Sequence, residues 1–382
     1  MAGGFDGDVV TLPGISPDCH DGITTMVNTL LSESLAKSTK TNYTSKMNLF
    51  IKFLMQYGLM LTTLQGAQPV VPDVTPVLLM FFCAYMVMRG HKSAGSIVGY
   101  CGAVKQWCLI HDRPDPTLNR RTQTIDIRYA RLLRAVKRRL GTKSSIRKPL
   151  SISGLKSILA AVRSGFIVHA SMVDDLVAAI LLGFYAMLRV SEFTNLYTTM
   201  HDGLREATRA DIRFFGPPEC PDGFTFVVKV SKTTQFRTIQ TLNVYKSPDP
   251  ALCPVRAMHR LYVEDPQPGS APLFDFTRRT GNAEDRARSG ARGWFIREFQ
   301  TAARFCGLST AEIQSHSLRS GGATAYLQAG VDPYIIQRMG RWRSWCLMTY
   351  TWASTLHIQN AMESIATCNH NANPVNLDEV RW

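Results

Sequence analysis

The sequence lacks several features that would assign it to common functional classes. Its apolar stretches, such as "LLMFFCAYMVM" at 78–88, are too short to cross a bilayer and indicate buried helices. Its start, "MAGGFDGDVVTLPG", has neither the basic nor the apolar region of a signal peptide. The nine cysteines include no C-x-x-C pair, which argues against a zinc site and against a disulfide framework. We therefore expect a protein of the reducing cell interior that binds neither a membrane nor a metal.

Acidic residues are scarce in the first part of the chain. The 382 residues carry a formal net charge of +14, and residues 1–150 contribute +10 of it, with 19 Lys or Arg against 9 Asp or Glu. A basic excess confined to one region is typical of a protein that binds a polyanion, above all nucleic acid. Ordinary solvated lysines on the surface are the alternative explanation.

The length and the residue patterns predict two main domains. Residues 38–58 follow Ser and Thr caps and repeat apolar side chains at helical spacing, and similar patterns continue to residue 140. After Pro149 come further helical patterns and a stretch of alternating residues typical of strands. We expect a mainly α fold with a small antiparallel β-sheet. The predicted parts are a disordered N-terminus (1–22), a helical domain (23–140), a basic linker (141–150), an α+β domain (151–366) and a C-terminal tail (367–382).

Residues 131–148 contain eight basic residues and no acidic one. This stretch is either an exposed helix end followed by a solvated hinge or a hinge that lies on phosphates, and it could also serve as a nuclear localisation signal. Basic residues in and before it are the candidates for contact with DNA: Lys40, Lys92, Arg138, Arg139 and Lys148.

Several short motifs of the second domain carry residues suited to phosphate chemistry. Taken singly, each has an ordinary explanation, such as an internal salt bridge between Arg189 and Glu192 or a surface lysine at position 232. Gly321 and Gly322 would let the backbone approach either a phosphate or a neighbouring helix. In chain order the motifs are "AMLRVSE" with Arg189 and Glu192, "VSKTTQ" with Lys232, "HSLRSGGAT" with His316 and Arg319, and "GRWRSWCLMTY" with Trp342 and Tyr350.

Together and in this order, these motifs resemble the tyrosine recombinase (phage integrase) family. The resemblance covers residues 150–366, and the helical N-terminal part is similar in outline to that family's core-binding domain. The segments "SKTTQ" and "LCPVRAMHRLY" resemble sequences of the family's eukaryotic transposon-borne branch, such as Crypton-like or DIRS-like elements. This branch implies a role in transposon mobility and a nuclear location, whereas a chain from a cell without a nucleus would be cytoplasmic.

The resemblance implies an enzyme that cuts and rejoins DNA through a 3′-phosphotyrosine. Tyr350 would be the nucleophile, and Arg189 and Arg319 would clamp the scissile phosphate, because planar guanidinium forks match its oxygens. His316 would hydrogen-bond the phosphate and assist proton transfer from the tyrosine, and Lys232 would protonate the 5′-oxygen leaving group.

Two further residues complete the implied site. Glu192 would support Arg189, and Trp342 stands where many relatives have histidine and could donate one hydrogen bond. Because the covalent intermediate conserves the energy of the phosphodiester bond, the resemblance implies no cofactor, metal or ATP. If Tyr350 is not the nucleophile, Tyr326 and Tyr334 are the nearby candidates.

The implied partner is double-stranded DNA, held by a homotetramer, because strand exchange needs cut ends from two duplexes and one site cuts one strand. Two alternatives stay open. A type IB topoisomerase shares the chemistry, and a domesticated, catalytically silent DNA-binding protein would keep the fold without the reaction.

Overall fold

The chain divides into two compact units, Met1–Ser144 and Ser145–Trp382, and the division falls inside the predicted basic linker. The computed structural model describes residues 17–35, 37–60, 70–91, 93–141, 147–195, 201–229, 239–274, 276, 291–342, 344 and 347.

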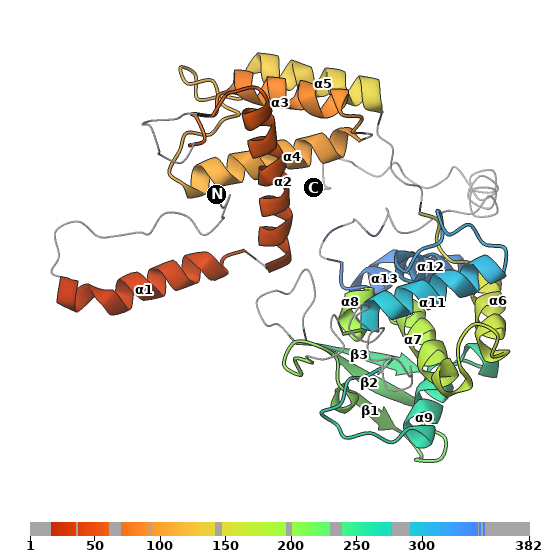
Figure 1. The fold of residues 1–382 in the computed structure, drawn as a ribbon. Coiled ribbons are helices and arrows are strands. Elements are labelled where there is room, and N and C mark those ends of the chain that lie inside the picture. Colours follow the sequence, from red (N-terminus) through yellow and green to blue (C-terminus); the bar gives the residue numbers. More distant parts are fainter. Residues whose placement is uncertain are drawn as a thin grey trace, which may run out of the picture. The chain divides into compact units, whose positions relative to one another are not determined.

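The main elements in the described part of the first unit are all helices, joined by loops (Figure 1). Its helix α1 starts at Pro17, where proline suits the first turn of a helix. Helix α1 therefore begins inside the segment 1–22 whose disorder stays a prediction, and residues 1–16 lie outside the described ranges. The helices are α1 (Pro17–Glu33), α2 (Lys37–Gln56), α3 (Pro76–Met88), α4 (Ala94–Ile110) and α5 (Ile127–Leu140).

Aromatic side chains of α2 and α3 build the centre of this unit's core. The Phe50 and Phe82 rings meet edge to face with centroids 5.0 Å apart, and Phe53 packs on Tyr85 at 5.2 Å. Helix α4 adds Trp107, whose indole is also buried. Such aromatic pairs contribute beyond their burial, so the predicted helical domain has a core of its own.

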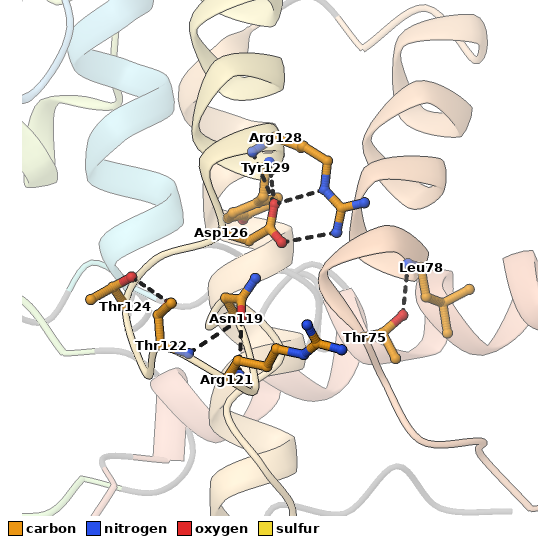
Figure 2. A network of polar contacts seen from close by, with 9 residues as sticks. All are labelled: Thr75, Leu78, Asn119, Arg121, Thr122, Thr124, Asp126, Arg128 and Tyr129. Atoms are coloured by element: carbon orange, nitrogen blue, oxygen red, sulfur yellow. Dashed lines mark hydrogen bonds and ion pairs between the residues drawn. The ribbon is translucent and has the colours of Figure 1, made fainter.

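The loop before α5 sets where that basic helix begins (Figure 2). Asp126, only 2% exposed, accepts hydrogen bonds from the backbone N–H groups of Arg128 and Tyr129 and pairs with the Arg128 guanidinium at 3.0 Å. In the preceding turn, Asn119 accepts from the backbone of Arg121 and Thr122. A carboxylate that satisfies the first N–H groups of a helix stabilises its start. Helix α5 is thereby anchored with its basic side chains outward.

The second unit combines helices with a three-stranded antiparallel sheet in the order β1-β2-β3. The prediction of a mainly α fold with a small antiparallel sheet is confirmed. Short single-turn 3-10 helices lie between some of the main elements. In chain order these elements are α6 (Ile152–Arg163), α7 (Val173–Tyr185), α8 (Val190–Phe193), β1 (Ile212–Phe215), β2 (Gly223–Val228), β3 (Gln240–Tyr245), α9 (Pro254–Glu264), α11 (Ala291–Phe305), α12 (His316–Gln328) and α13 (Pro333–Met339).

Helix α7 is the centre of the second unit, because nearly every one of its residues is buried. Helix α12 packs on it through the glycines of "HSLRSGGAT". A Cβ on Gly322 would collide with the carbonyl oxygen of Phe184, and one on Gly321 with that of Leu150. Of the two explanations for these glycines, the structure supports helix packing. This close approach brings the start of α12 beside the turn that follows α7.

Candidate active site

The paired Arg189 and Glu192 lie where the buried helix α7 gives way to the short helix α8. Arg189 forms the N-cap of α8, and Glu192 accepts a hydrogen bond from its backbone N–H and another from its Nη1, both at 2.9 Å. The Glu192 side chain is fully buried, whereas that of Arg189 is 19% exposed. The ion pair expected as the ordinary explanation is therefore present, and it leaves Arg189 able to touch a ligand.

A second arginine, Arg341, shares the same carboxylate. Its Nη2 donates to Oε2 of Glu192 at 2.8 Å, and its side chain is only 5% exposed. Its Nη1 lies 3.3 Å from the carbonyl oxygen of Ala186, in the turn after α7. Sequence reasoning missed this residue, because its partner lies 149 positions away; the one signal was its place in "GRW". One carboxylate between two guanidiniums leaves the group with a net positive charge.

Arg319 is fully buried and engaged by backbone carbonyl groups. It donates from Nη1 to Met187 and from Nη2 to Gly340, the latter at 2.7 Å. These bonds tie α12 to the turn after α7 and to the end of α13. A phosphate could contact Arg319 only after its guanidinium had left these carbonyl oxygens, so its predicted role as a clamp remains a prediction.

Trp342 covers the buried guanidinium. Its ring lies 4.4 Å from Cζ of Arg319 and packs with Met187 and Ile336 in a small apolar cluster. A Cβ on Gly340 would overlap this ring, which explains the glycine of "GRW". The structure thus gives Trp342 a packing and cation–π role beside Arg319. The hydrogen bond that its indole N–H could donate in the implied site remains a prediction.

His316, at the start of α12, lies in a cationic environment. Burial and the positive charges of Arg319, Arg147 and Arg189 lower the pKa of His316 from 6.5 to about 4. The imidazole is therefore neutral at neutral pH. Arg147 belongs to the basic stretch 131–148 but was not singled out in the sequence, and this electrostatic contact places it near the site. Three motifs far apart in the sequence are therefore brought together around one cationic cluster, formed by Arg147, Arg189, His316 and Arg319.

Lys232 and Tyr350 lie outside the described residues. Lys229, close in sequence to Lys232, pairs with Asp211 at 2.7 Å and donates to the Gly203 carbonyl, so it has a structural task. Among the alternative nucleophiles, Tyr326 donates to the carbonyl oxygen of Tyr185, and burial raises its pKa to about 12. Tyr334 is 58% exposed.

The predicted DNA-contacting residues differ in their surroundings. Arg138 and Arg139 are exposed on the last turn of α5, where Arg134, Lys137 and Arg138 line a hollow of about 360 Å³ with Gly141. Lys148 pairs with Glu312 at 2.9 Å on the surface, and Lys40 is half-buried on α2. Lys92 lies outside the described residues.

Within the described ranges, no group of three or more His, Cys, Asp or Glu side chains could hold a metal ion. No helix in that same part of the chain is long and apolar enough to span a membrane.

No protein-family model matches the chain, and a search of curated proteins gives no match by sequence. Its fold matches solved structures of DNA recombinases. Against a λ integrase fragment, residues 75–356, solved as a dimer on a COC′ core site, the TM-score is 0.52 with 17% identity over 88% of this chain and 98% of that chain. This chain has the tyrosine recombinase fold.

Two further solved structures agree. The XerH site-specific recombinase in a post-cleavage complex with palindromic difH gives a TM-score of 0.54 at 12% identity, over 91% of this chain and 85% of that one. The Tn1549 transposon integrase on a circular-intermediate DNA gives 0.51 at 14% identity, over 86% and 94%. At these identities the tyrosine recombinase fold is shared although the sequences have diverged.

We predict that Glu192→Gln lowers the free energy of unfolding by about 3–5 kcal/mol, because two buried guanidinium contacts lose their carboxylate partner. Denaturant unfolding of the whole chain measures this loss. The matched control is Asp202→Asn, which removes the exposed pair with Arg205 and should cost less than about 1 kcal/mol. A loss for Glu192→Gln as small as that of the control would contradict a structural role for the shared carboxylate.

We also predict that the His316 imidazole titrates near pH 4 in NMR spectra of histidine-labelled protein, with His316→Asn assigning its signal. Arg147→Gln should raise this midpoint, because it removes one of the nearby positive charges. Arg205→Gln, a control outside the cluster, should leave the midpoint unchanged. A midpoint at the ordinary value of about 6.5 would show that the imidazole is not in a buried cationic environment.

Proposed function

We propose that this chain is a site-specific DNA recombinase that cuts and rejoins DNA through a tyrosine–phosphate bond. The observation that carries the proposal is the cationic cluster of Arg147, Arg189, His316 and Arg319, built on a buried Glu192 within a tyrosine recombinase fold. A scissile phosphodiester is an anion whose charge grows in the transition state, and fixed cations stabilise that charge. Arg147 and Arg189 are both accessible to such an anion, and the neutral imidazole of His316 can accept a proton during the reaction.

In the proposed reaction the hydroxyl oxygen of Tyr350 attacks the phosphorus, and the bond from phosphorus to the 5′-oxygen breaks. The phenolic proton passes to His316, and Lys232 protonates the departing 5′-oxygen. A bound phosphate would offset the surrounding positive charge and raise the pKa of His316, which makes the imidazole a better proton acceptor when substrate is present. The covalent product stores the bond energy, so the 5′-hydroxyl of a partner strand can reverse the step.

Arg189 contacts the phosphate in this scheme without rearrangement, because its side chain is 19% exposed whereas that of Arg319 is fully buried. Arg319 joins the clamp by exchanging its carbonyl partners for phosphate oxygens. Double-stranded DNA is the proposed substrate, and a homotetramer holding two duplexes is the proposed working assembly. The DNA complexes of λ integrase and XerH support the choice of substrate, and the Tn1549 transposon integrase supports a role in transposon mobility.

One observation favours a second candidate, a DNA-binding protein that no longer cleaves. Arg319 is fully buried and bonded to two carbonyl groups, so the described arrangement shields it from any ligand. A silent protein would keep the fold, the basic surface of α5 and Arg189 while Arg319 served packing alone.

We predict that the wild-type chain forms a covalent adduct with DNA and that Tyr350→Phe forms none while still binding, because only the nucleophilic oxygen is removed. The probe is a pool of nicked duplexes with random sequence on both sides of the nick, recovered on protein after denaturation. Tyr334→Phe, a change at an exposed tyrosine, is the control that should keep the adduct.

The outcomes separate the candidates. Binding without any adduct from the wild type identifies the silent DNA-binding protein. An adduct from Tyr350→Phe at the wild-type level assigns the nucleophile to another residue.

Arg189→Lys should lower the adduct yield by about 100-fold, since an ammonium cannot replace a two-pronged guanidinium in the transition state.

We predict that exchanging Arg134, Lys137 and Arg138 for Gln weakens DNA binding on all sequences and flattens its salt dependence by about 0.9 for each phosphate that is no longer neutralised. These side chains line the hollow on α5. The control removes three exposed charges from the second unit, with Gln at Arg205, Arg256 and Arg260. Equal slopes for both variants would mean that only net charge matters and that the hollow holds no phosphate.

A further inference from the structure

Helix α1 presents an apolar stripe that no described residue covers. Ile23, Met26, Val27, Leu30 and Leu31 repeat at the spacing of one helix face, and each is between 37% and 62% exposed. The opposite face carries polar residues such as Thr25. An amphipathic helix normally packs its apolar face on something, so this face, the α1 stripe, requires a partner surface.

The same unit contains an apolar groove that fits a helix. The α2–α3 groove has a volume of about 570 Å³, and its lining includes the exposed side chains of Tyr57, Phe81 and Met88. Among the described residues that line it, none carries a charge. A groove of this kind is the usual receptor for an amphipathic helix, which inserts residues spaced three and four apart.

The α1 stripe cannot fill the groove of its own chain. At 1.5 Å per residue, Phe53 in the groove lies about 24 Å beyond Lys37 along α2, whereas Ile23 lies about 15 Å before Glu33 along α1. A fully extended connection from Glu33 to Lys37 adds about 13 Å, which would bring the first stripe residues level with Phe53 but leave Leu30 and Leu31 short of the groove. At its first residue this connection turns, because the N–H of Ser34 donates to the carbonyl of Leu31.

Helix α1 and the rest of the first unit, which contains the groove, also carry net charges of opposite sign. Helix α1 contains Asp18, Asp21 and Glu33 but no Lys or Arg, whereas residues 37–144 hold 17 Lys or Arg against 4 Asp or Glu. At the groove itself, Arg89 donates to the hydroxyl of Tyr85, one of the lining residues. An acidic helix approaching a basic bundle gains favourable electrostatics on top of apolar burial.

We propose that α1 of one copy docks its apolar stripe in the α2–α3 groove of a second copy of this chain. Each copy then supplies one helix and one groove, so the contact can link successive copies in a ring or pair two copies by exchange. The contact involves no DNA and none of the residues assigned to the reaction. The contact can therefore be tested independently of the proposed recombinase activity.

Sedimentation of the whole chain over a concentration series, without DNA, tests the contact. The wild type should self-associate, and Leu30→Glu or Phe81→Glu should each weaken association by about 100-fold, because a charge would enter an apolar contact. Two controls should leave it unchanged: Thr25→Glu on the polar face of α1, and Val98→Glu at an exposed position outside the groove. Leu30→Glu combined with Phe81→Arg should restore part of the association, since the new charges would meet.

A crosslinking experiment distinguishes docking between two chains from docking within one chain. A photoreactive benzoylphenylalanine replaces Leu31 in a mixture of ¹⁴N- and ¹⁵N-labelled protein, and mass spectrometry identifies the linked peptides. Mixed-isotope crosslinks to 53–59 or 77–88 support docking in trans. Crosslinks to these segments within one chain, crosslinks to 351–382 instead, or a wild type that stays monomeric would each overturn the proposal.

Discussion

The candidate site depends on one buried carboxylate. The side chain of Glu192 has no exposed surface. Burial of a lone carboxylate would be costly, so its position is stable only while guanidinium groups surround it. It binds Arg189 beside it in sequence and Arg341 far along the chain. Through these bonds the turn after α7 and the end of α13 are held against each other, and Arg319 adds a second connection between the same two places.

This arrangement leaves more positive than negative charge in a partly closed region. The consequence appears at His316, where burial and three arginines keep the imidazole neutral. An uncharged ring beside fixed cations is prepared to receive a proton once an anion enters and offsets the field. The proposed reaction uses this property, and the structure gives it a physical cause that does not depend on the resemblance between sequences.

The first unit separates its charges in a way that fits two different contacts. Helix α5 exposes its arginines and lysines because Tyr129 and Val136 are the residues that it buries. Basic side chains line a hollow at its end. Helix α1 is acidic and apolar, and its stripe matches a groove between α2 and α3. One surface thus suits a polyanion, and the other suits a copy of the same chain.

The sequence by itself determined the helical first domain, the small antiparallel sheet, and the order of motifs that resembles tyrosine recombinases. Local spacing carries that information, since caps, periodic apolar residues and short motifs involve neighbours in the chain. It also anticipated the Arg189 and Glu192 pair, which are three residues apart. Only the tertiary structure decided that Arg341 shares Glu192, that Arg319 is buried under Trp342, and that Gly321 and Gly322 serve helix packing. The reason is physical: a buried charge takes whichever partner the fold brings within a few ångströms, and that distance is set by how helices pack and not by their separation along the chain.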